Sequence, residues 1–593
     1  MKKFLSKFLY VTRGKHKVLF TMSCLFIVSS LFEMGGVGLI GPFAAMVADT
    51  SFIEKTDWLR ALYTHFSFNS TEKFIFCFGV FTVVIFYLKA ALSFTTQKSV
   101  AQFAHGLKGD LSCKLMQSYL AAPYTLHLTK NSANLVQSLV TSTDRFCIGL
   151  VLSLLTAVSN SAIIVALVIL LISTNAFASI GIAVVILVSF AVLNPLKTKL
   201  THWGKEGYDA SAEMIQILNH GLGGLKETRI IGCEPYFQSQ MTESAGKYSR
   251  NMGLASGYAN LPRYIVEAVI ISFLIIFAFL FVTFNQDNSQ NINSIFGIFA
   301  IASIRLLPAT GNTISCINVI RYNSHSLDVL FSELKEVERF SEKRSFIKQE
   351  NDWYKHGNKI NFQRKIIIED LVYRYPSGTT NALDGITLNI KKGQSIGLIG
   401  KSGSGKTTLV DVLMGLLSPQ SGDIKIDGVS VYSNLREWQN LIGYVPQSIF
   451  LIDDTLERNI AFGVPDNLID RQRLQKAIEA AQLGEVVAKL PMGSQTMVGE
   501  RGILLSGGQR QRVGIARALY HEKEILVFDE ATAALDNETE SLITDATKLL
   551  SGSKTIIIIA HRLTTIEHCD CIYRIEKGRI SQSGNYQKVV LGQ

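Results

Sequence analysis

The chain has 593 residues, of which 48% are hydrophobic and 18% charged, and its formal net charge is +10. This length exceeds what one hydrophobic core usually holds, so we expect at least two domains. The basic residues form no tract with interleaved aromatic residues, which argues against a nucleic-acid partner. The eight cysteines are scattered, and Cys569 and Cys571 are too close together for a zinc knuckle, so no disulfide framework or metal site is expected.

The N-terminal segment is basic and leads into an apolar stretch that starts near residue 18. Its basic residues are Lys2, Lys3, Lys7, Arg13, Lys15 and Lys17. A signal peptide begins in the same way, but no clear small-residue cleavage site follows, and the apolar stretch is longer than the hydrophobic region of a signal. We therefore predict an uncleaved first membrane helix. The short basic start is unlike an organellar transit peptide, which favours a bacterial plasma membrane.

Six apolar segments come close to the roughly 20 residues that a membrane-spanning helix needs. They cover about 18–46, 74–94, 146–173, 176–194, 264–284 and 295–318. A buried helix pair in a soluble protein is the alternative, but a soluble protein would have to cover an unusually large apolar surface. The segments predict an all-α, six-helix transmembrane domain over residues 1–325.

The distribution of charge predicts how these helices are oriented. Lys and Arg are in excess in the N-terminal segment and in the connections 95–145 and 196–263, whereas Asp and Glu prevail in 47–72 and 285–294. The positive-inside rule then places the N-terminus, both long connections and the C-terminus in the cytoplasm.

The two long connections are rich in helix-forming residues. The first has a heptad-like apolar spacing, at Leu107, Leu111, Leu115 and Leu120. Structureless loops of this length are uncommon, so we expect the membrane helices to continue into the cytoplasm.

Beyond Arg321 the chain becomes polar, and residues 326–360 are predicted to be a linker. From there short β-branched runs alternate with helical patterns, which is typical of an α/β domain with a largely parallel sheet, here over 361–593. The predicted strands are 366–372, 386–390, 395–399, 525–528 and 555–559.

The predicted strand 395–399 leads into a glycine-rich loop that is followed by a helical pattern. This strand–loop–helix context is that of a phosphate-binding loop. Backbone N–H groups and a helix N-terminus would hold the phosphates, Lys406 would neutralise the β and γ oxygens, and the Thr407 hydroxyl would bind Mg²⁺. The candidate nucleotide-binding residues are Gly400, Ser402, Gly403, Ser404, Gly405, Lys406, Thr407 and Thr408.

An Asp-Glu pair follows the apolar predicted strand 525–528. Asp529 would bind Mg²⁺, and Glu530 would act as general base for the attacking water. On its own such a pair is often a helix N-cap. Together with the phosphate-binding loop, it predicts an ATP-hydrolysing site.

The segment 505–509, Leu-Ser-Gly-Gly-Gln, resembles the signature motif of ATP-binding-cassette (ABC) proteins. The resemblance extends through 361–593 in the family's order, and 498–502 is similar to the X-loop of exporters. By this resemblance Tyr375 is the aromatic residue that stacks on adenine, and Gln447 is the glutamine of the Q-loop. Asp536 is the aspartate of the D-loop, and His561 is the switch histidine.

The resemblance implies ATP and Mg²⁺ as cofactors. Glu530, His561 and Gln447 are then catalytic, and Thr407, Gln447 and Asp529 bind the metal. The resemblance also implies that the signature residues Ser506, Gly507, Gly508 and Gln509 close over the ATP of a second subunit. Their helix N-terminus and backbone donors can hold a γ-phosphate, and they lie too far along the domain to be expected to fold back on their own loop. Since the catalytic residues are all present, a homodimer is favoured over an asymmetric pair.

ABC exporters fuse six helices to one ATPase domain as this chain does, and charged residues inside membrane spans are often functional. Lys89, Arg263 and Arg305 would line a cavity for an anionic head group. Snorkelling of Lys89 and Arg263 to the interface, or pairing of Arg263 with Glu267, is the structural alternative. Glu33 lies near several glycines and would hydrogen-bond across a close helix contact.

Short stretches in the first helix, in the second connection and after the Q-loop are similar to bacterial flippases of lipid-linked oligosaccharides. That resemblance favours such a substrate, with a glycolipid or phospholipid, a drug or a peptide as alternatives. A regulatory ATPase that transports nothing would lack catalytic residues or be soluble. We expect alternating access, with 123–130 and 208–225 as segments that transmit motion between the domains.

Overall fold

The structure is a computed structural model that divides into two compact units, Met1–Ala122 with Leu126–Arg344, and Pro123–Thr125 with Ser345–Gln593. The residues that the structure describes are 2–174, 196–284, 289–341, 360–376, 378–529, 548, 550–560 and 562–592.

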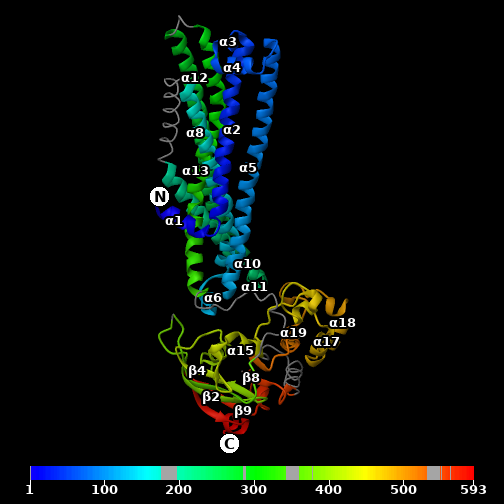
Figure 1. Cartoon of the computed structure of the whole chain (residues 1–593). Coiled ribbons are helices and arrows are strands. Elements are labelled where there is room, and N and C mark those ends of the chain that lie inside the picture. The colour runs from blue at the N-terminus through cyan, green and yellow to red at the C-terminus, as the bar shows by residue number, and fades with distance from the viewer. Residues whose placement is uncertain are drawn as a thin grey trace. The chain divides into compact units, whose positions relative to one another are not determined.

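The described part of the first unit is helical, and its long helices α2, α5, α8, α12 and α13 run alongside one another (Figure 1). Backbone polar groups in a bilayer must be satisfied internally, which a helix achieves within one segment. The elements are α1 (Lys2–Val11), α2 (His16–Ala48), α3 (Phe52–Lys55), α4 (Asp57–His65), α5 (Thr71–Ala121), α6 (Tyr124–Thr129), α7 (Ser132–Gln137), η1 (Ser138–Ser142), η2 (Arg145–Val151), α8 (Leu152–Thr174), α10 (Leu196–Gly223), α11 (Leu225–Ile231), α12 (Glu234–Phe284) and α13 (Ser289–Ser341).

Three of these helices are much longer than a bilayer is thick. α5, α12 and α13 contain 51, 51 and 53 residues. At 1.5 Å per residue they are about 75–80 Å long, whereas the hydrocarbon core is about 30 Å thick. Each helix is therefore longer than a membrane span requires, and in α5 and α12 the additional length lies in the connections 95–145 and 196–263.

Five of the six predicted membrane segments fall on described helices, and 176–194 lies outside the described residues. Within the described residues, three spans are long and apolar enough to cross a membrane, namely His16–Val47, Thr71–Ala121 and Asn134–Ser173. The third span includes η1 and η2, which are π-helical turns, a local variant that is frequent at functional sites.

The second unit contains two sheets. The larger has the order β10-β9-β3-β8-β7-β6, and the smaller has the order β2-β1-β4-β5. The strands are β1 (Lys365–Tyr373), β2 (Leu383–Lys391), β3 (Ser395–Ile399), β4 (Ser421–Ile426), β5 (Val429–Ser430), β6 (Ile442–Val445), β7 (Ile525–Asp529), β8 (Thr555–Ile559), β9 (Cys571–Glu576) and β10 (Arg579–Gly584). The main helices are α14 (Lys406–Leu413), α15 (Leu435–Leu441), α16 (Leu456–Ile460), α17 (Arg471–Ala480), α18 (Gly484–Lys489) and α19 (Gly507–Tyr520).

The larger sheet positions the functional segments. β3, β8, β7 and β6 are parallel neighbours, and β3, β7 and β8 are buried along their whole length. Carboxyl ends of parallel strands lie at one edge of a sheet, which is where open α/β sheets bind ligands. The segments that follow β3, β6 and β7 therefore meet at that edge.

One feature of the predicted sheet is wrong. The sequence suggested that 366–372 and 386–390 belong to a largely parallel sheet, but β1 and β2 pair antiparallel in the smaller sheet, together with β4 and β5. Their burial alternates along most of their length, as expected for a sheet that packs one face on the core.

Candidate functional site

The loop between β3 and α14 has a backbone that only glycine can provide at two positions. Gly400 and Gly405 have φ angles of 151° and 108°. A Cβ at Gly400 would lie 2.2 Å from the Ile575 carbonyl oxygen, and one at Gly405 would lie 2.6 Å from that of Ala382. Glycine at these positions lets the loop pack directly against the backbone of β9 and of the residue before β2, in the left-handed conformation that glycine tolerates.

Two buried polar side chains lie in this loop. The Lys406 ammonium donates hydrogen bonds to the carbonyl oxygens of Gly400 and Lys401, at 2.8 and 3.1 Å. The Ser404 hydroxyl is buried and has no hydrogen-bond partner among the described residues. An unsatisfied hydroxyl and a buried cation beside open backbone suit a bound triphosphate, which would supply acceptor oxygens to both. The loop therefore fits the predicted ATP.

Asp529 ends β7 and its side chain is buried. The Tyr444 hydroxyl on β6 donates a hydrogen bond of 3.1 Å to the Asp529 Oδ2. Burial, and then the negative charge of Asp529, raise the pKa of Tyr444, so the hydroxyl keeps its proton as a donor. Burial and the nearby Asp529 also raise the pKa of Asp411, on α14, to about 6.

These contacts bring together a carboxylate pair that the sequence does not reveal. Asp411 and Tyr444 were missed because their relation to Asp529 depends on the packing of α14 and the pairing of β6 with β7. The one available signal is the position of Tyr444 within the strand that precedes Gln447. Thr407 and Gln447 are exposed next to these elements, so the predicted metal ligands are all oxygen donors, the type that Mg²⁺ prefers.

Tyr375 lies beside the phosphate-binding loop. Its hydroxyl is 3.1 Å from the Thr408 Oγ1, and its ring makes an edge contact with Tyr373. The predicted adenine-stacking ring and the first turn of α14 are thus held together. Ser402 and Gly403 are exposed in the loop between them.

The signature segment begins α19 with a capping box. The Ser506 hydroxyl accepts a hydrogen bond from the Gln509 backbone N–H, and the Gln509 side chain accepts one from the Ser506 backbone N–H. Reciprocal capping fixes the orientation of the helix N-terminus. Gly507 and Gly508 form the first turn between them.

Four predicted residues cannot be placed fully. Glu530, Asp536 and His561 lie outside the described residues, and for Arg263 only the backbone, within α12, is described. Their predicted roles stay predictions.

The first unit contains a charged cluster within its apolar helices. The Lys89 ammonium on α5 donates a hydrogen bond of 2.5 Å to the Glu33 Oε1 on α2, and both side chains are at least nine-tenths buried. The Arg305 Nε on α13 lies 3.8 Å from the same oxygen, and its side chain is 44% exposed. Two cations therefore share one carboxylate, which leaves one positive charge.

An aromatic ring completes this cluster. The ring centroid of Phe86, on α5, lies 5.1 Å from the Lys89 Nζ and 5.9 Å from the Arg305 guanidinium carbon. Among the described residues, Glu33 and Phe86 are the partners of Arg305. Lys89, which was predicted to line a cavity, is buried and paired with Glu33, whereas the Arg305 side chain is partly exposed. Sequence reasoning missed Phe86, since an aromatic residue in an apolar span carries no distinguishing signal.

Comparisons with known proteins point to one family. The ABC transporter family profile matches residues 383–533. An ATP-dependent lipid A-core flippase of Ralstonia nicotianae is 30% identical over 486 residues, which cover 81% of this chain and 79% of the relative. The flippase of the same name from Shewanella frigidimarina is 27% identical over 581 residues, with 95% and 94% covered.

The fold of the whole chain is also known. A solved bacterial Atm1-family ABC exporter with ATP bound is similar, with a TM-score of 0.76 and 19% identity over 97% of both chains. An identity this low shows the fold alone.

Proposed function

This chain is a half-transporter of the ABC exporter family, and from that membership we propose that two copies form an ATP-driven flippase for an anionic glycolipid. As a half-transporter it couples ATP hydrolysis to transport, and it is a multi-pass protein of the bacterial inner membrane. The observation that carries the substrate proposal is the Glu33–Lys89–Arg305 cluster, in which two cations share one carboxylate between membrane helices.

The nucleotide site would work through residues of the second unit. Lys406 and the Ser404 hydroxyl would bind phosphate oxygens, and Asp529, Thr407 and Gln447 would hold Mg²⁺, which offsets charge that develops on the phosphates. Glu530 would take the proton of the attacking water, and His561 would stabilise the γ-phosphate. Tyr375 would stack on adenine, and Asp536 would contribute to the nucleotide site.

The second copy would complete each nucleotide site. The capping box of Ser506 and Gln509 holds the N-terminus of α19 in one orientation, with Gly507 and Gly508 leaving its backbone bare. A helix N-terminus attracts a phosphate through its unpaired N–H groups and its dipole. A homodimer would therefore contain two composite sites, each with the loop of one copy and the signature of the other.

The substrate class follows from the relatives and from charge. The named relatives are flippases of lipid A-core, which supports a glycolipid over the lipid-linked oligosaccharide that the sequence favoured. A net positive cluster with an exposed guanidinium would attract phosphate or carboxylate on the sugar part of such a lipid, because Arg binds these groups in a bidentate manner. Arg263 remains a further candidate for this surface.

The proposed orientation places both termini in the cytoplasm. Lys and Arg prevail in the N-terminal segment and in the two long connections. The positive-inside rule then assigns these segments to the cytoplasmic side. Both nucleotide domains would accordingly have access to cellular ATP.

We test the proposal by measuring ATP hydrolysis of the purified protein in liposomes. A glycolipid with phosphate groups should stimulate hydrolysis more than the same glycolipid without them, because the cluster leaves one positive charge to bind the anion. A polyprenyl-diphosphate oligosaccharide provides the competing substrate class. Equal stimulation by the charged and uncharged glycolipid would contradict the proposed recognition, and stimulation by the polyprenyl compound alone would restore the earlier substrate prediction.

A further inference from the structure

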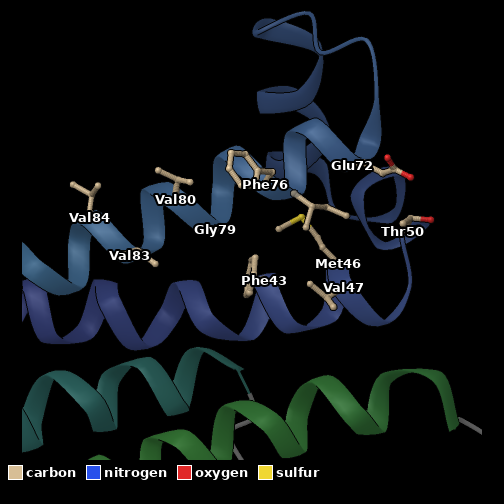
Figure 2. Close-up of a pocket in the computed structure, with 11 residues that line it drawn as sticks. Phe43, Met46, Val47, Thr50, Glu72, Phe76, Gly79, Val80, Val83 and Val84 are labelled. Carbon is tan, nitrogen blue, oxygen red and sulfur yellow. The ribbon is translucent and has the colours of Figure 1, made fainter.

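A groove of about 650 Å³ lies between α2 and α5, near the end of the helix pair that carries α3 and α4 (Figure 2). Its lining residues are Phe43, Met46, Val47, Thr50, Glu72, Ile75, Phe76, Gly79, Val80, Val83 and Val84. Nine of these eleven are glycine or apolar residues, and the groove opens to the side of the helix pair. None of Glu33, Lys89 and Arg305 lines it.

Gly79 lets the two helices of the groove approach closely. A Cβ at Gly79 would lie 2.9 Å from the Phe43 ring, so the ring on α2 rests directly against the α5 backbone. Val80 and Val83 remain about half exposed, and Phe76 is 73% exposed. These exposed side chains form an apolar surface along the groove.

The polar residues of the groove lie at one end. Figure 2 shows Thr50 and Glu72 together at that end, with the valines of α5 towards the other. Glu72 is exposed and has no ion-pair partner among the described residues. Lys55 pairs with Asp49 instead, and Lys73 is displaced by about 100° around the helix from Glu72. Glu72 is therefore the one charged residue among those that line the groove, and its charge is negative.

The groove has the length of one lipid tail. Glu72 and Val84 are twelve positions apart on α5, which corresponds to about 18 Å along the helix. One leaflet of the hydrocarbon core is about 15 Å deep. A chain in the groove would thus reach from the interface to the bilayer centre.

We propose that this groove binds a phospholipid with an ethanolamine head group. One acyl chain lies against the valines and Phe43, and the ammonium pairs with the Glu72 carboxylate. The charge of Glu72 is the reason for assigning this head group, because a carboxylate attracts an ammonium and repels a head group with a net negative charge. The site differs from that of the transported lipid, because none of Glu33, Lys89 and Arg305 lines the groove, and its head group is zwitterionic rather than anionic.

The test measures lipid retained by the purified full-length protein. The protein is equilibrated in liposomes with equal amounts of phosphatidylethanolamine and phosphatidylglycerol, extracted in detergent, and its bound lipids are counted by native mass spectrometry. We expect phosphatidylethanolamine to be retained about threefold over phosphatidylglycerol, the size of an exposed ion-pair effect. Glu72→Gln should remove this preference, whereas Glu54→Gln, on the nearby helix α3, should keep it.

A second pair of variants tests the groove itself. Val80→Trp fills the space between the helices and should abolish retention of both lipids, whereas Leu88→Trp, at an exposed position of α5 outside the groove, should have no effect. Equal retention of the two lipids by the unchanged protein would overturn the head-group assignment. Unchanged retention in Val80→Trp would overturn the site, and if this variant altered subunit association instead, a second copy would be the occupant.

Discussion

The Asp529 carboxylate accepts a hydrogen bond from Tyr444, a residue outside the sequence motif that contains Asp529. Tyr444 holds one of its oxygens by a hydrogen bond of 3.1 Å, across neighbouring strands of the larger sheet. Carboxylates that bind metals are usually oriented by such outer contacts, and loss of one weakens metal binding. Tyr444 is thus a positioning residue for the proposed metal site, while Asp529 itself would touch the ion.

Tyr444→Phe should weaken binding of Mg²⁺ with ATP. Loss of one hydrogen bond is worth about 1 kcal/mol, or roughly fivefold in affinity. A Mg²⁺ titration of fluorescent-nucleotide binding measures the effect without turnover. Tyr432→Phe is the matched control, because the buried Tyr432 hydroxyl has no partner among the described residues and its removal breaks no bond. If nucleotide binding by Tyr444→Phe depends on Mg²⁺ as in the unchanged protein, the hydrogen bond from Tyr444 to Asp529 does not contribute to metal binding.

At the scale of single residues, the sequence predicts those functional residues that lie together in a short motif. The motifs of Lys406 and its loop, of Asp529 and of the signature could be recognised because each is a short run with a fixed chemistry. Asp411 and Tyr444 were not, because their nearness to Asp529 comes from strand pairing and helix packing between distant segments. The same limit applies to Lys89, whose buried partner Glu33 is 56 residues away.

Among the helices, α2 and α5 are joined by a charged contact in apolar surroundings. Breaking a buried ion pair by removing one partner leaves an uncompensated charge, which costs about 3 kcal/mol or more. Arg305 shares the carboxylate, so it too loses its counter-charge when Glu33 changes. The pair therefore holds the helices together and sets the charge of the cluster.

Glu33→Gln should lower the melting temperature of the purified protein, because Lys89 stays buried without a carboxylate. Adding Lys89→Met should restore much of the loss, since a neutral side chain of similar length fills the space. Thermal unfolding in detergent measures both, with Glu54→Gln as a control at an exposed carboxylate. If the single variant melts as the unchanged protein does, the ion pair does not stabilise the helix contact.

Helix periodicity was predictable, but its details were not. Leu107, Leu111 and Leu115 are buried along one face of α5, as their spacing predicts. The fourth predicted position, Leu120, is 72% exposed. Tyr119 is buried instead, because it lies four residues after Leu115 and therefore on the same face of the helix. The runs that became β1 and β2 were recognised as strands, yet period alone does not say which sheet a strand joins.

At the scale of the whole molecule, the proposed function requires two copies of the chain. The loop and the signature belong to the same unit, and each has the local geometry to hold phosphate. A homodimer would bring the two together across its interface and couple closure of the nucleotide domains to the helices. The division into an apolar helical part and an α/β part could be predicted from the sequence, because composition and periodicity change sharply between them.

The most direct test is ATP-dependent flipping of a phosphorylated glycolipid in proteoliposomes that contain only this protein. We expect the unchanged protein to move the lipid between leaflets only with ATP and Mg²⁺. Glu530→Gln, which should retain ATP but not hydrolyse it, should abolish flipping, and Arg305→Ala should lower the amount flipped per ATP hydrolysed. Flipping at the same rate without ATP, or steady ATP hydrolysis with no movement of the lipid, would contradict the account.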